Sequence, residues 1–147
     1  MDQHNITIYT DGSCIGNPGP GGWAALLMCG EHEKVVTGND KDTTNNRMEL
    51  TAVIEGLACV KSRNSNITIY SDSKYVVEGA KSWVRRWRFN GWRTAAGKPV
   101  MNMDLWQELV KITDKHTIRW LWVKAHNGNK HNERVDGLAQ AAAMEML

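Results

Sequence analysis

One short sequence occurs twice in the chain, first as Asn5-Ile6-Thr7-Ile8-Tyr9-Thr10-Asp11 and again as Asn66-Ile67-Thr68-Ile69-Tyr70-Ser71-Asp72. The copies differ only where the first has Thr10 and the second has Ser71. Each copy alternates β-branched and aromatic residues over a short run, which predicts a strand that ends in an aspartate. The fold is therefore expected to be built around two similar strands.

The two aspartates would crowd each other if these strands were neighbours in register. The two-residue period puts Asp11 on the strand face of Tyr9, and Asp72 on the face of Tyr70. Neighbouring strands lie about 4.8 Å apart, and two like charges about 5 Å apart repel by roughly 3 kcal/mol at an effective dielectric constant of about 20. A shared proton or a hard metal ion would relieve the repulsion. The alternative is that a common strand pattern recurs by chance and each aspartate only begins a turn.

Length and composition predict one globular domain over residues 1–147, because the chain is 41% hydrophobic and 23% charged. The polar start, Met1 to Asn5, lacks the apolar region of a signal peptide, and no stretch has the length of a membrane span. We therefore expect a cytoplasmic protein without a membrane partner. The three cysteines, Cys14, Cys29 and Cys59, include no CxxC pair, so we expect reduced thiols instead of a disulfide framework or a zinc site.

A basic segment from Lys81 to Lys98 contrasts with an acidic remainder. It holds 6 of the 18 basic residues and no acid, which leaves 12 basic residues against 16 acids elsewhere. Three tryptophans, Trp83, Trp87 and Trp92, are interleaved with its arginines. Arginine binds phosphates, and flat rings stack on sugars and bases, so the segment predicts the wall of a nucleic-acid groove. The alternative is that the tryptophans pack a core while the arginines solubilise the surface.

The part of the chain between the two copies predicts a meander and a crossover helix. Strands over 23–29 and 34–38, joined around Gly30, continue from the first copy as antiparallel neighbours. Capping residues at 43–46 then precede a helix over 48–60. This helix leads back to the second copy of the repeat, which makes the connection a crossover.

After the second copy the chain is expected to form three helices and one more strand. One helix begins after Ser73, and Asn102 and Asn132 are expected to cap the other two. A strand over 117–123 separates those two helices. Its residues are apolar on both faces, so we expect it to be covered on both sides.

Three features have ordinary explanations when each is considered alone. The Gly- and Pro-rich stretch 11–22 matches no phosphate-binding motif and is interpreted as a connecting turn, although its glycines would let a ligand approach closely. Glu49 is expected in the first turn of its helix, where it complements the helix dipole. His126 and His131 fall in a polar loop over 124–132, where a histidine is either solvated or suited to proton transfer.

Taken together, these stretches resemble the type 1 ribonuclease H family of the bacterial kind, over essentially the whole chain. The resemblance is specific because it rests on several motifs in the same order. The matching residues are Thr10-Asp11-Gly12-Ser13, Asn17 to Gly22, Thr44 to Leu50, Ser71-Asp72-Ser73, the Trp-rich basic segment, Trp122-Val123-Lys124 with His126, and Asn132 to Asp136.

The resemblance implies an α/β fold with a five-stranded mixed sheet flanked by helices on both faces, the first strand lying between the meander and the parallel strands. It also implies an endoribonuclease that cuts the RNA strand of an RNA–DNA hybrid and leaves 3′-hydroxyl and 5′-phosphate ends. The family's four carboxylate positions and its catalytic-loop histidine are matched by Asp11, Glu49, Asp72, Asp136 and His126.

Two Mg²⁺ ions, with Mn²⁺ as a substitute, are the cofactors that the resemblance implies. Two ions about 3.5–4 Å apart stabilise the attacking and leaving oxygens of an in-line displacement. Mg²⁺ prefers oxygen ligands and is completed by substrate phosphate, so few carboxylates suffice. Asp11 would bridge both ions, Asp72 and Glu49 would complete one, and Asp136 would hold the other. His126 would assist proton movement or product departure, because imidazole is a poor ligand for Mg²⁺.

The substrate contacts that the resemblance implies fall into three groups. Gly12, Cys14 and Asn17 belong to a turn that, with Glu49, contacts the 2′-hydroxyl by which RNA differs from DNA. Asn17, Thr44 and Asn45 would hold a phosphate of the DNA strand. A further set would line the groove: Ser73, Trp83, Arg85, Arg86, Trp87, Arg88 and Trp92. The expected partner is the RNA–DNA hybrid duplex, and the protein is expected to act as a monomer.

The chain also departs from the family pattern. Lys74 stands where the family has a glutamine that touches the minor groove. Phe89-Asn90 stand where the family has further basic residues in the Trp-rich segment. Little chain follows Ala143.

Two other functions compete with the expected one. The first is a DNA nuclease on the same fold, because a fold does not fix the substrate. The second is a binding module without catalytic activity, but the presence of all four carboxylates argues against it.

Overall fold

The two copies of the repeated sequence form neighbouring strands, β1 (Asn5–Cys14) and β4 (Asn66–Ser71), in the computed structural model, which describes residues 5–147. They run parallel and in register, from Asn5 opposite Asn66 to Thr10 opposite Ser71. The predicted side-by-side arrangement is thus confirmed. Residues 1–4, on which the expectation about the polar start rested, lie outside the described part.

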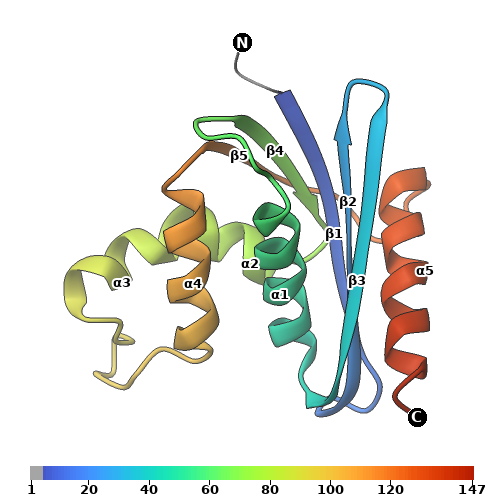
Figure 1. Ribbon diagram of the computed structural model, residues 1–147. Helices are drawn as coiled ribbons and strands as arrows, with labels where there is room; N and C mark the ends of the chain where they lie inside the picture. Colours follow the sequence, from blue (N-terminus) through green and yellow to red (C-terminus); the bar gives the residue numbers. More distant parts are fainter. Residues whose placement is uncertain (1–4) are drawn as a thin grey trace.

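The other three strands complete a mixed sheet of order β3-β2-β1-β4-β5, as Figure 1 shows. β2 (Gly19–Cys29) and β3 (His32–Thr43) form the antiparallel meander on one side of β1. β5 (Thr117–Trp122) pairs in parallel with β4 on the other side. The expected α/β architecture with a five-stranded mixed sheet is therefore confirmed.

Helices cover both faces of this sheet (Figure 1). On one face lie α1 (Asn45–Ala58) and α4 (Met103–Thr113). A continuous helical run leads away from the end of β4 as α2 (Lys74–Glu78), a π-helical turn η1 (Gly79–Trp83) and α3 (Val84–Asn90). The last helix, α5 (Lys130–Met144), packs on β1, β2 and β3 from the opposite face.

The core has two layers because side chains alternate along the strands. Ile8, Ile67 and Ile69 are buried beneath α1 and α4, together with the fully buried Trp106. On the α5 side, Tyr9 packs with a small cluster whose other buried members are Ala24, Leu26, Val135 and Ala139. The exact register stacks the rings of Tyr9 and Tyr70 with their centroids 4.6 Å apart. The same register carries the chain on to Asp11 and Asp72.

The interpretation of stretch 11–22 as a connecting turn holds only for residues 15–18, since β1 extends to Cys14 and β2 begins at Gly19. Glycine serves close packing here. A Cβ atom on Gly12 would lie 2.4 Å from the backbone nitrogen of Glu49 in α1, and one on Gly22 would lie 2.3 Å from the carbonyl oxygen of Ala139 in α5. The glycines therefore let both helices approach the sheet.

Of the two asparagine caps predicted for the later helices, the one at Asn132 is wrong. Asn129 caps α5 instead, because its Oδ1 accepts bonds from the backbone nitrogens of His131 (3.1 Å) and Asn132 (3.0 Å). Asn102 occupies the N-cap position of α4 as predicted, in a left-handed conformation (φ 61°), but its side chain makes no capping hydrogen bond. Its amide instead donates to the hydroxyl of Tyr75 at 3.1 Å.

β5 is an edge strand and is not covered on both sides as expected. Thr117, Arg119 and Trp122 are exposed along it. Ile118 and Trp120 pack against the α1 side of the core, whereas α5 lies on the other strands and leaves the second face of β5 open. The apolar residues of this strand therefore did not signal two-sided burial.

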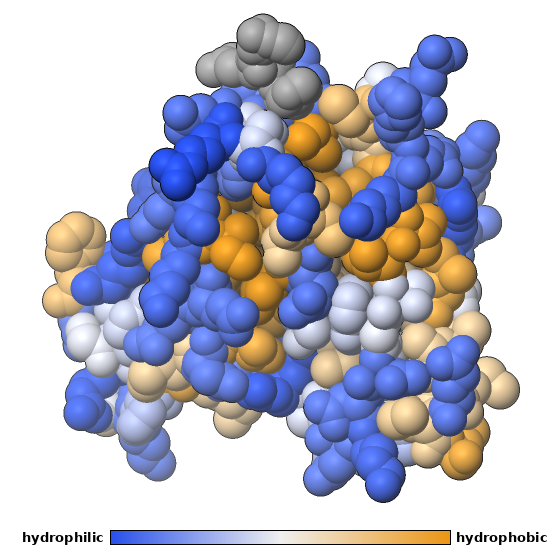
Figure 2. All heavy atoms as spheres, in the orientation of Figure 1, coloured by the Kyte–Doolittle hydropathy of each residue, from blue (hydrophilic) through white to orange (hydrophobic). Residues whose placement is uncertain are grey.

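The described part of the chain has neither a membrane-spanning helix nor a disulfide bond. Among residues 5–147, no helix is both long and apolar enough to span a bilayer. Cys14, Cys29 and Cys59 are free thiols, as expected. The face in Figure 2 is largely hydrophilic, and hydrophobic residues gather over the sheet beyond the end of α1. A hollow of about 210 Å³ lies there, lined in part by Ile6, Leu27 and Val60.

Candidate active site

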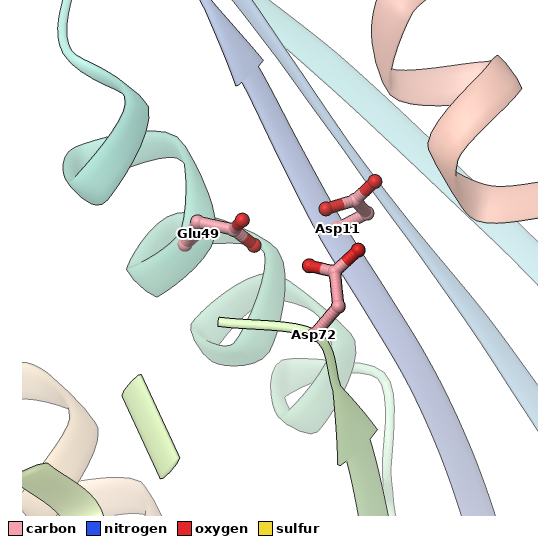
Figure 3. Close-up of side chains that lie close together, drawn as sticks. All are labelled: Asp11, Glu49 and Asp72. Atoms are coloured by element: carbon pink, nitrogen blue, oxygen red, sulfur yellow. The ribbon is translucent and has the colours of Figure 1, made fainter. Parts of the chain in front are cut away.

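Three carboxylates meet at the end of the paired strands. Asp11 lies in β1, Asp72 follows β4 directly, and Glu49 reaches them from α1, so that all three point toward one another (Figure 3). One oxygen from each lies within 4.8 Å of those of the other two. Asp11 and Glu49 are buried and Asp72 is half-buried. Such a cluster of hard oxygen donors is suited to a divalent cation.

Glu49 reaches the cluster because α1 begins close to β1. The helix starts after Thr44, whose Oγ1 accepts a bond from the backbone nitrogen of Arg47 at 3.2 Å. Glu49 lies beyond the first turn and is 4% exposed. The alternative in which Glu49 lies in the first turn and only complements the helix dipole is therefore wrong. The missing side chain of Gly12 allows the close contact that brings Glu49 to Asp11.

The crowded carboxylates favour their protonated forms. Burial, followed by the charges of Glu49 and Asp72, raises the pKa of Asp11. Burial and the charge of Asp72 raise the pKa of Glu49 well above its ordinary value. Burial also raises the pKa of Asp72, although hydrogen bonds from its neighbours oppose the shift. In the metal-free protein the site is thus electrostatically strained at neutral pH.

The donor set fits a divalent metal ion. Oε1 of Glu49 is buried and has no hydrogen-bond partner among the described residues. A buried carboxylate oxygen without a partner is costly, and a cation would satisfy it. Asp11 Oδ1 accepts one bond, from the backbone nitrogen of Gly12 at 2.9 Å, which leaves it further acceptor capacity.

Asp136, the fourth predicted carboxylate, lies next to this cluster on α5. It is half-buried and its charge contributes to the raised pKa of Asp11. Its Oδ2 accepts a bond from Nε2 of Gln140, one turn along the helix, at 3.0 Å. Asp136 does not belong to the group of three oxygens that lie within 4.8 Å of one another. Asp136 therefore lies outside this group but close enough for its charge to act on Asp11.

The two predicted loop histidines have different surroundings. His126 is exposed in the segment between β5 and α5, with a left-handed backbone (φ 55°), and its charge lowers the pKa of Asp72. His131 is not in the loop, because α5 begins at Lys130. Its ring lies 5.0 Å from that of Tyr9, and its buried Nδ1 has no partner among residues 5–147. Of the two, His126 is the one beside the carboxylates.

A polar hollow of about 520 Å³ contains several predicted substrate contacts. Its lining includes four of them, Cys14, Asn17, Thr44 and Asn45, with Asn46, Met101 and Asn102. Asn17 Oδ1 accepts a bond from the backbone nitrogen of Asn45 at 2.9 Å, which ties the turn after β1 to the start of α1. The thiol of Cys14 donates to the carbonyl oxygens of Gly19 and Thr43, both at 3.4 Å.

The predicted groove segment divides into packed rings and exposed cations. The rings of Trp83, Trp87 and Trp92 form a chain with centroids 5.9 and 6.1 Å apart, and Trp87 lies 5.5 Å from the buried Trp106. The alternative that the tryptophans pack a core therefore holds for the ring surfaces that contact one another and Trp106. Arg85 and Arg86 are exposed, whereas Arg88 pairs with Asp114 at 2.9 Å. Phe89, at a family position for a basic residue, is 92% exposed.

The remaining predicted contacts, Gly12 and Ser73, also have structural roles. Gly12 is buried under α1. Ser73 caps α2, because its Oγ accepts a bond from the backbone nitrogen of Val76 at 3.2 Å. Ser73 therefore fixes the direction in which the chain leaves Asp72.

Sequence reasoning missed two residues that hold Asp72. The indole nitrogen of Trp122 donates to the backbone oxygen of Asp72 at 3.1 Å. The side-chain amide of Asn132 donates to its Oδ2 at 3.5 Å. Both residues belong to stretches that carried the family resemblance, but they were interpreted as a strand residue and a helix cap. No local pattern signals a contact between residues so far apart in the chain.

Comparisons with known sequences give consistent matches over nearly the whole chain. The family model described as RNase H matches residues 3–144. The chain is 52% identical over 144 residues to a ribonuclease H of Francisella philomiragia, covering 98% of this chain and 94% of the relative. It is 51% identical over 140 residues to one of Ehrlichia chaffeensis, covering 95% of each.

A solved structure is similar as well. The crystal structure of LC9-RNase H1, described as a type 1 RNase H with the type 2 active-site motif, superposes with a TM-score of 0.89 at 32% identity. The match covers 100% of this chain and 75% of that one. The fold of the chain as a whole thus has a counterpart of known structure.

Proposed function

Because the chain belongs to the ribonuclease H family, we propose that it hydrolyses the RNA strand of RNA–DNA hybrids with two divalent metal ions. The observation that carries this proposal is the cluster of Asp11, Glu49 and Asp72, whose oxygens lie within 4.8 Å of one another. The products are a 3′-hydroxyl and a 5′-phosphate. The metal is Mg²⁺, with Mn²⁺ as a substitute, because all the donors are carboxylate oxygens.

The carboxylates divide between the two metal sites. Asp11 would be the carboxylate shared by both ions, because it belongs to the group with Glu49 and Asp72 and is also affected by the charge of Asp136. Glu49 and Asp72 would complete one site, and Asp136 would serve the second. When bound there, two such ions supply Lewis-acid stabilisation of the attacking and leaving oxygens. Trp122 and Asn132 keep Asp72 in position through its backbone oxygen and its Oδ2.

His126 moves protons at the edge of the site. It is exposed and close enough to Asp72 to affect the pKa of that carboxylate. An imidazole in this position can accept or donate a proton while water and product exchange. His126 does not coordinate the metal, because the carboxylate oxygens are the ligands that Mg²⁺ prefers.

The DNA strand lies along the polar hollow and the Trp-rich segment. Asn17, Thr44 and Asn45 bring amide and hydroxyl donors together there, which suits a phosphate. The exposed Arg85 and Arg86 supply charge farther along, with Trp83, Trp87 and Trp92 as the ring surface beneath. Arg88 binds a phosphate once its ion pair with Asp114 is broken. The hydroxyl of Ser73 offers a further contact to the substrate beside Asp72.

The RNA strand is recognised at the turn after β1. Gly12, Cys14 and Asn17 border the start of α1, where Glu49 also lies, and contacts to the 2′-hydroxyl distinguish RNA from DNA. The protein acts as a single domain over residues 1–147 and as a monomer, because one chain supplies all four carboxylates.

The test is cleavage of a labelled RNA–DNA hybrid in Mg²⁺, with EDTA, single-stranded RNA, RNA duplex and DNA duplex as controls. We expect metal-dependent cutting of the RNA in the hybrid alone. Cutting of the DNA duplex would indicate a DNA nuclease on this fold. A hybrid that is bound but uncut would indicate a binding module.

A further inference from the structure

A second basic region lies away from the polar hollow, along the seam between the α2–η1–α3 run and the edge strand β5. Two neighbouring hollows of about 270 and 470 Å³ follow this seam, and Lys81 lines both. The basic seam, as we call it, carries four cations and two tryptophans: Lys74, Lys81, Arg85, Arg119, Trp120 and Trp122.

The cations of the basic seam are available to a ligand. Lys74, Lys81, Arg85 and Arg119 are all exposed. None of them takes part in the ion pairs found among residues 5–147, unlike Arg88, which is neutralised by Asp114. Glu78 is the one acid in the lining of the two hollows. The seam is therefore a site of uncompensated positive charge.

The basic seam faces away from the ring surface proposed for the DNA strand. Lys81 and Arg85 are four residues apart and so lie on one face of the helical run. Trp83 and Trp87, offset by two residues, lie on another face and pack toward Tyr75 and Trp106. One helical run thus presents two separate surfaces.

One end of the basic seam is joined to the carboxylate cluster. Trp122 lines the smaller hollow and donates its indole N–H to the backbone oxygen of Asp72 at 3.1 Å. The Nζ of Lys74 lies 4.8 Å from the centre of the Trp122 ring. Trp122 is 43% exposed, so its ring remains accessible. The seam therefore starts where the strand to be cleaved must lie.

We propose that the basic seam binds single-stranded RNA that continues from the cleaved strand beyond the end of the hybrid. Lys81 and Arg119 contact its phosphates, and Trp122 offers a surface on which a base stacks. Grooves for single-stranded nucleic acid combine these two elements, a cationic path and exposed aromatic rings. The choice of the RNA strand rests on the proposed function, because that strand occupies the carboxylate cluster.

The experiment measures affinity in EDTA, so that no cleavage occurs. Fluorescence anisotropy compares a blunt hybrid with hybrids that carry an overhang of about ten nucleotides, a length within the usual range of single-strand sites. RNA overhangs and DNA overhangs of both polarities form separate arms. The test variant is Lys81→Gln/Arg119→Gln. The matched control is Lys111→Gln/Lys115→Gln, which removes the same charge from exposed residues outside the seam.

For the unmodified protein we expect an RNA overhang of one polarity to tighten binding severalfold over the blunt hybrid. The test variant should lose this gain, and the control variant should keep it. Two lost phosphate contacts should also lower the slope of log affinity against log salt by about 1.4 for the overhang. The measurement is independent of cleavage, so it can fail while the hybrid is still cut, and the reverse also holds.

Three results would overturn the proposal. The first is an RNA overhang that adds no affinity. The second is a gain that survives in the Lys81→Gln/Arg119→Gln variant. The third is a gain confined to DNA overhangs. A polyglutamate peptide is included as a competitor, and if it binds the seam with the same charge dependence while RNA overhangs do not, the partner is an acidic protein segment.

Discussion

The carboxylate cluster and the aromatic protrusion, which we define as residues 74–102, affect the stability of the fold in opposite ways. In the cluster, like charges are held together by the paired strands and by α1, and burial raises the pKa values of Asp11 and Glu49. In the protrusion, the tryptophan rings pack inward and the arginines stay exposed. The first region is built for chemistry at the expense of stability, and the second gains stability from its packing. Substitutions in the two should therefore have opposite effects.

The largest effect on chemistry should come from Asp11→Asn, which removes the shared carboxylate. We expect cleavage of a labelled hybrid in Mg²⁺ to be abolished while hybrid binding, measured by anisotropy, stays largely intact. Asp40→Asn, an exposed position on β3, is the matched control and should cleave normally. Full residual activity of Asp11→Asn would contradict the metal assignment.

The largest effect on stability should come from Trp106→Ala, in α4 (Met103–Thr113), against which the rings of the protrusion pack. Trp106 is fully buried, packs on Trp87 and donates its indole N–H to the hydroxyl of Tyr75 at 2.9 Å. Removing a buried aromatic side chain costs about 3–5 kcal/mol of unfolding free energy, which urea denaturation measures. Phe89→Ala, at a position 92% exposed, should change stability by less than about 0.5 kcal/mol. Equal losses for the two variants would contradict the packing described for Trp106.

His126→Ala should slow turnover without affecting the fold. General acid–base groups typically contribute about 10²–10⁴ in rate, and we expect a loss within or below that range. The measurement is the turnover number at saturating hybrid, with thermal unfolding as the check on stability. His32→Ala, at an exposed position in β3, provides the control. An unchanged rate would mean that His126 is merely solvated.

The strain in the cluster predicts how stability depends on pH. The folded pKa values of Asp11, Glu49 and Asp72 are raised, so the folded state holds protons that the unfolded state releases above about pH 4. Their contribution to stability is full below that pH and is lost as the pH rises toward the folded values. Asp11→Asn should therefore stabilise the metal-free protein more at pH 7.5 than at pH 5.

Calorimetry of both proteins in EDTA at the two pH values tests this prediction, because titrations outside the site cancel in the difference. Each unit of pKa shift corresponds to about 1.4 kcal/mol. Saturating Mg²⁺ should stabilise the unmodified protein at pH 7.5 and have little effect on Asp11→Asn. A difference between the proteins that shrinks as the pH rises would contradict the raised pKa of Asp11.

The smallest effect is expected at the junction between the two regions, from Ser73→Ala. Loss of an N-cap hydroxyl costs about 0.5–2 kcal/mol, and this cap fixes α2 directly after Asp72. Ser73→Thr, which keeps a hydroxyl, should recover most of the loss in urea denaturation. If Ser73→Ala weakens hybrid binding and Ser73→Thr does not, the hydroxyl also contacts the substrate.

Much of the sheet could be predicted from the sequence because the relevant signal is local. The alternation in Asn5–Thr10 and in its second copy was sufficient to predict two strands, and their likeness suggested the pairing. Asp11 and Asp72 were brought together by that pairing alone. Glu49 and Asp136 were not, because no local pattern states which helix residue will face a strand end, and only the family resemblance assigned them.

The incorrect predictions share a physical cause, which is tertiary packing. The glycines of β1 and β2 were interpreted as a turn, although they are strand positions against which α1 and α5 pack closely. β5 looked like a covered strand, but its position at the edge of the sheet leaves Trp122 accessible. Asn132 looked like a cap, whereas Asn129 fills that role and Asn132 turns to Asp72.

The near identity of β1 and β4 has a consequence for folding specificity. Within the repeated stretch the strands differ only at Thr10 and Ser71, so that stretch alone does not decide which strand takes the centre of the sheet. The residue after each aspartate breaks this degeneracy. Gly12 lets β1 continue and accept α1 against it, whereas Ser73 stops β4 and starts a helix. These two positions therefore help to distinguish the strands and disfavour the topology in which their places are exchanged.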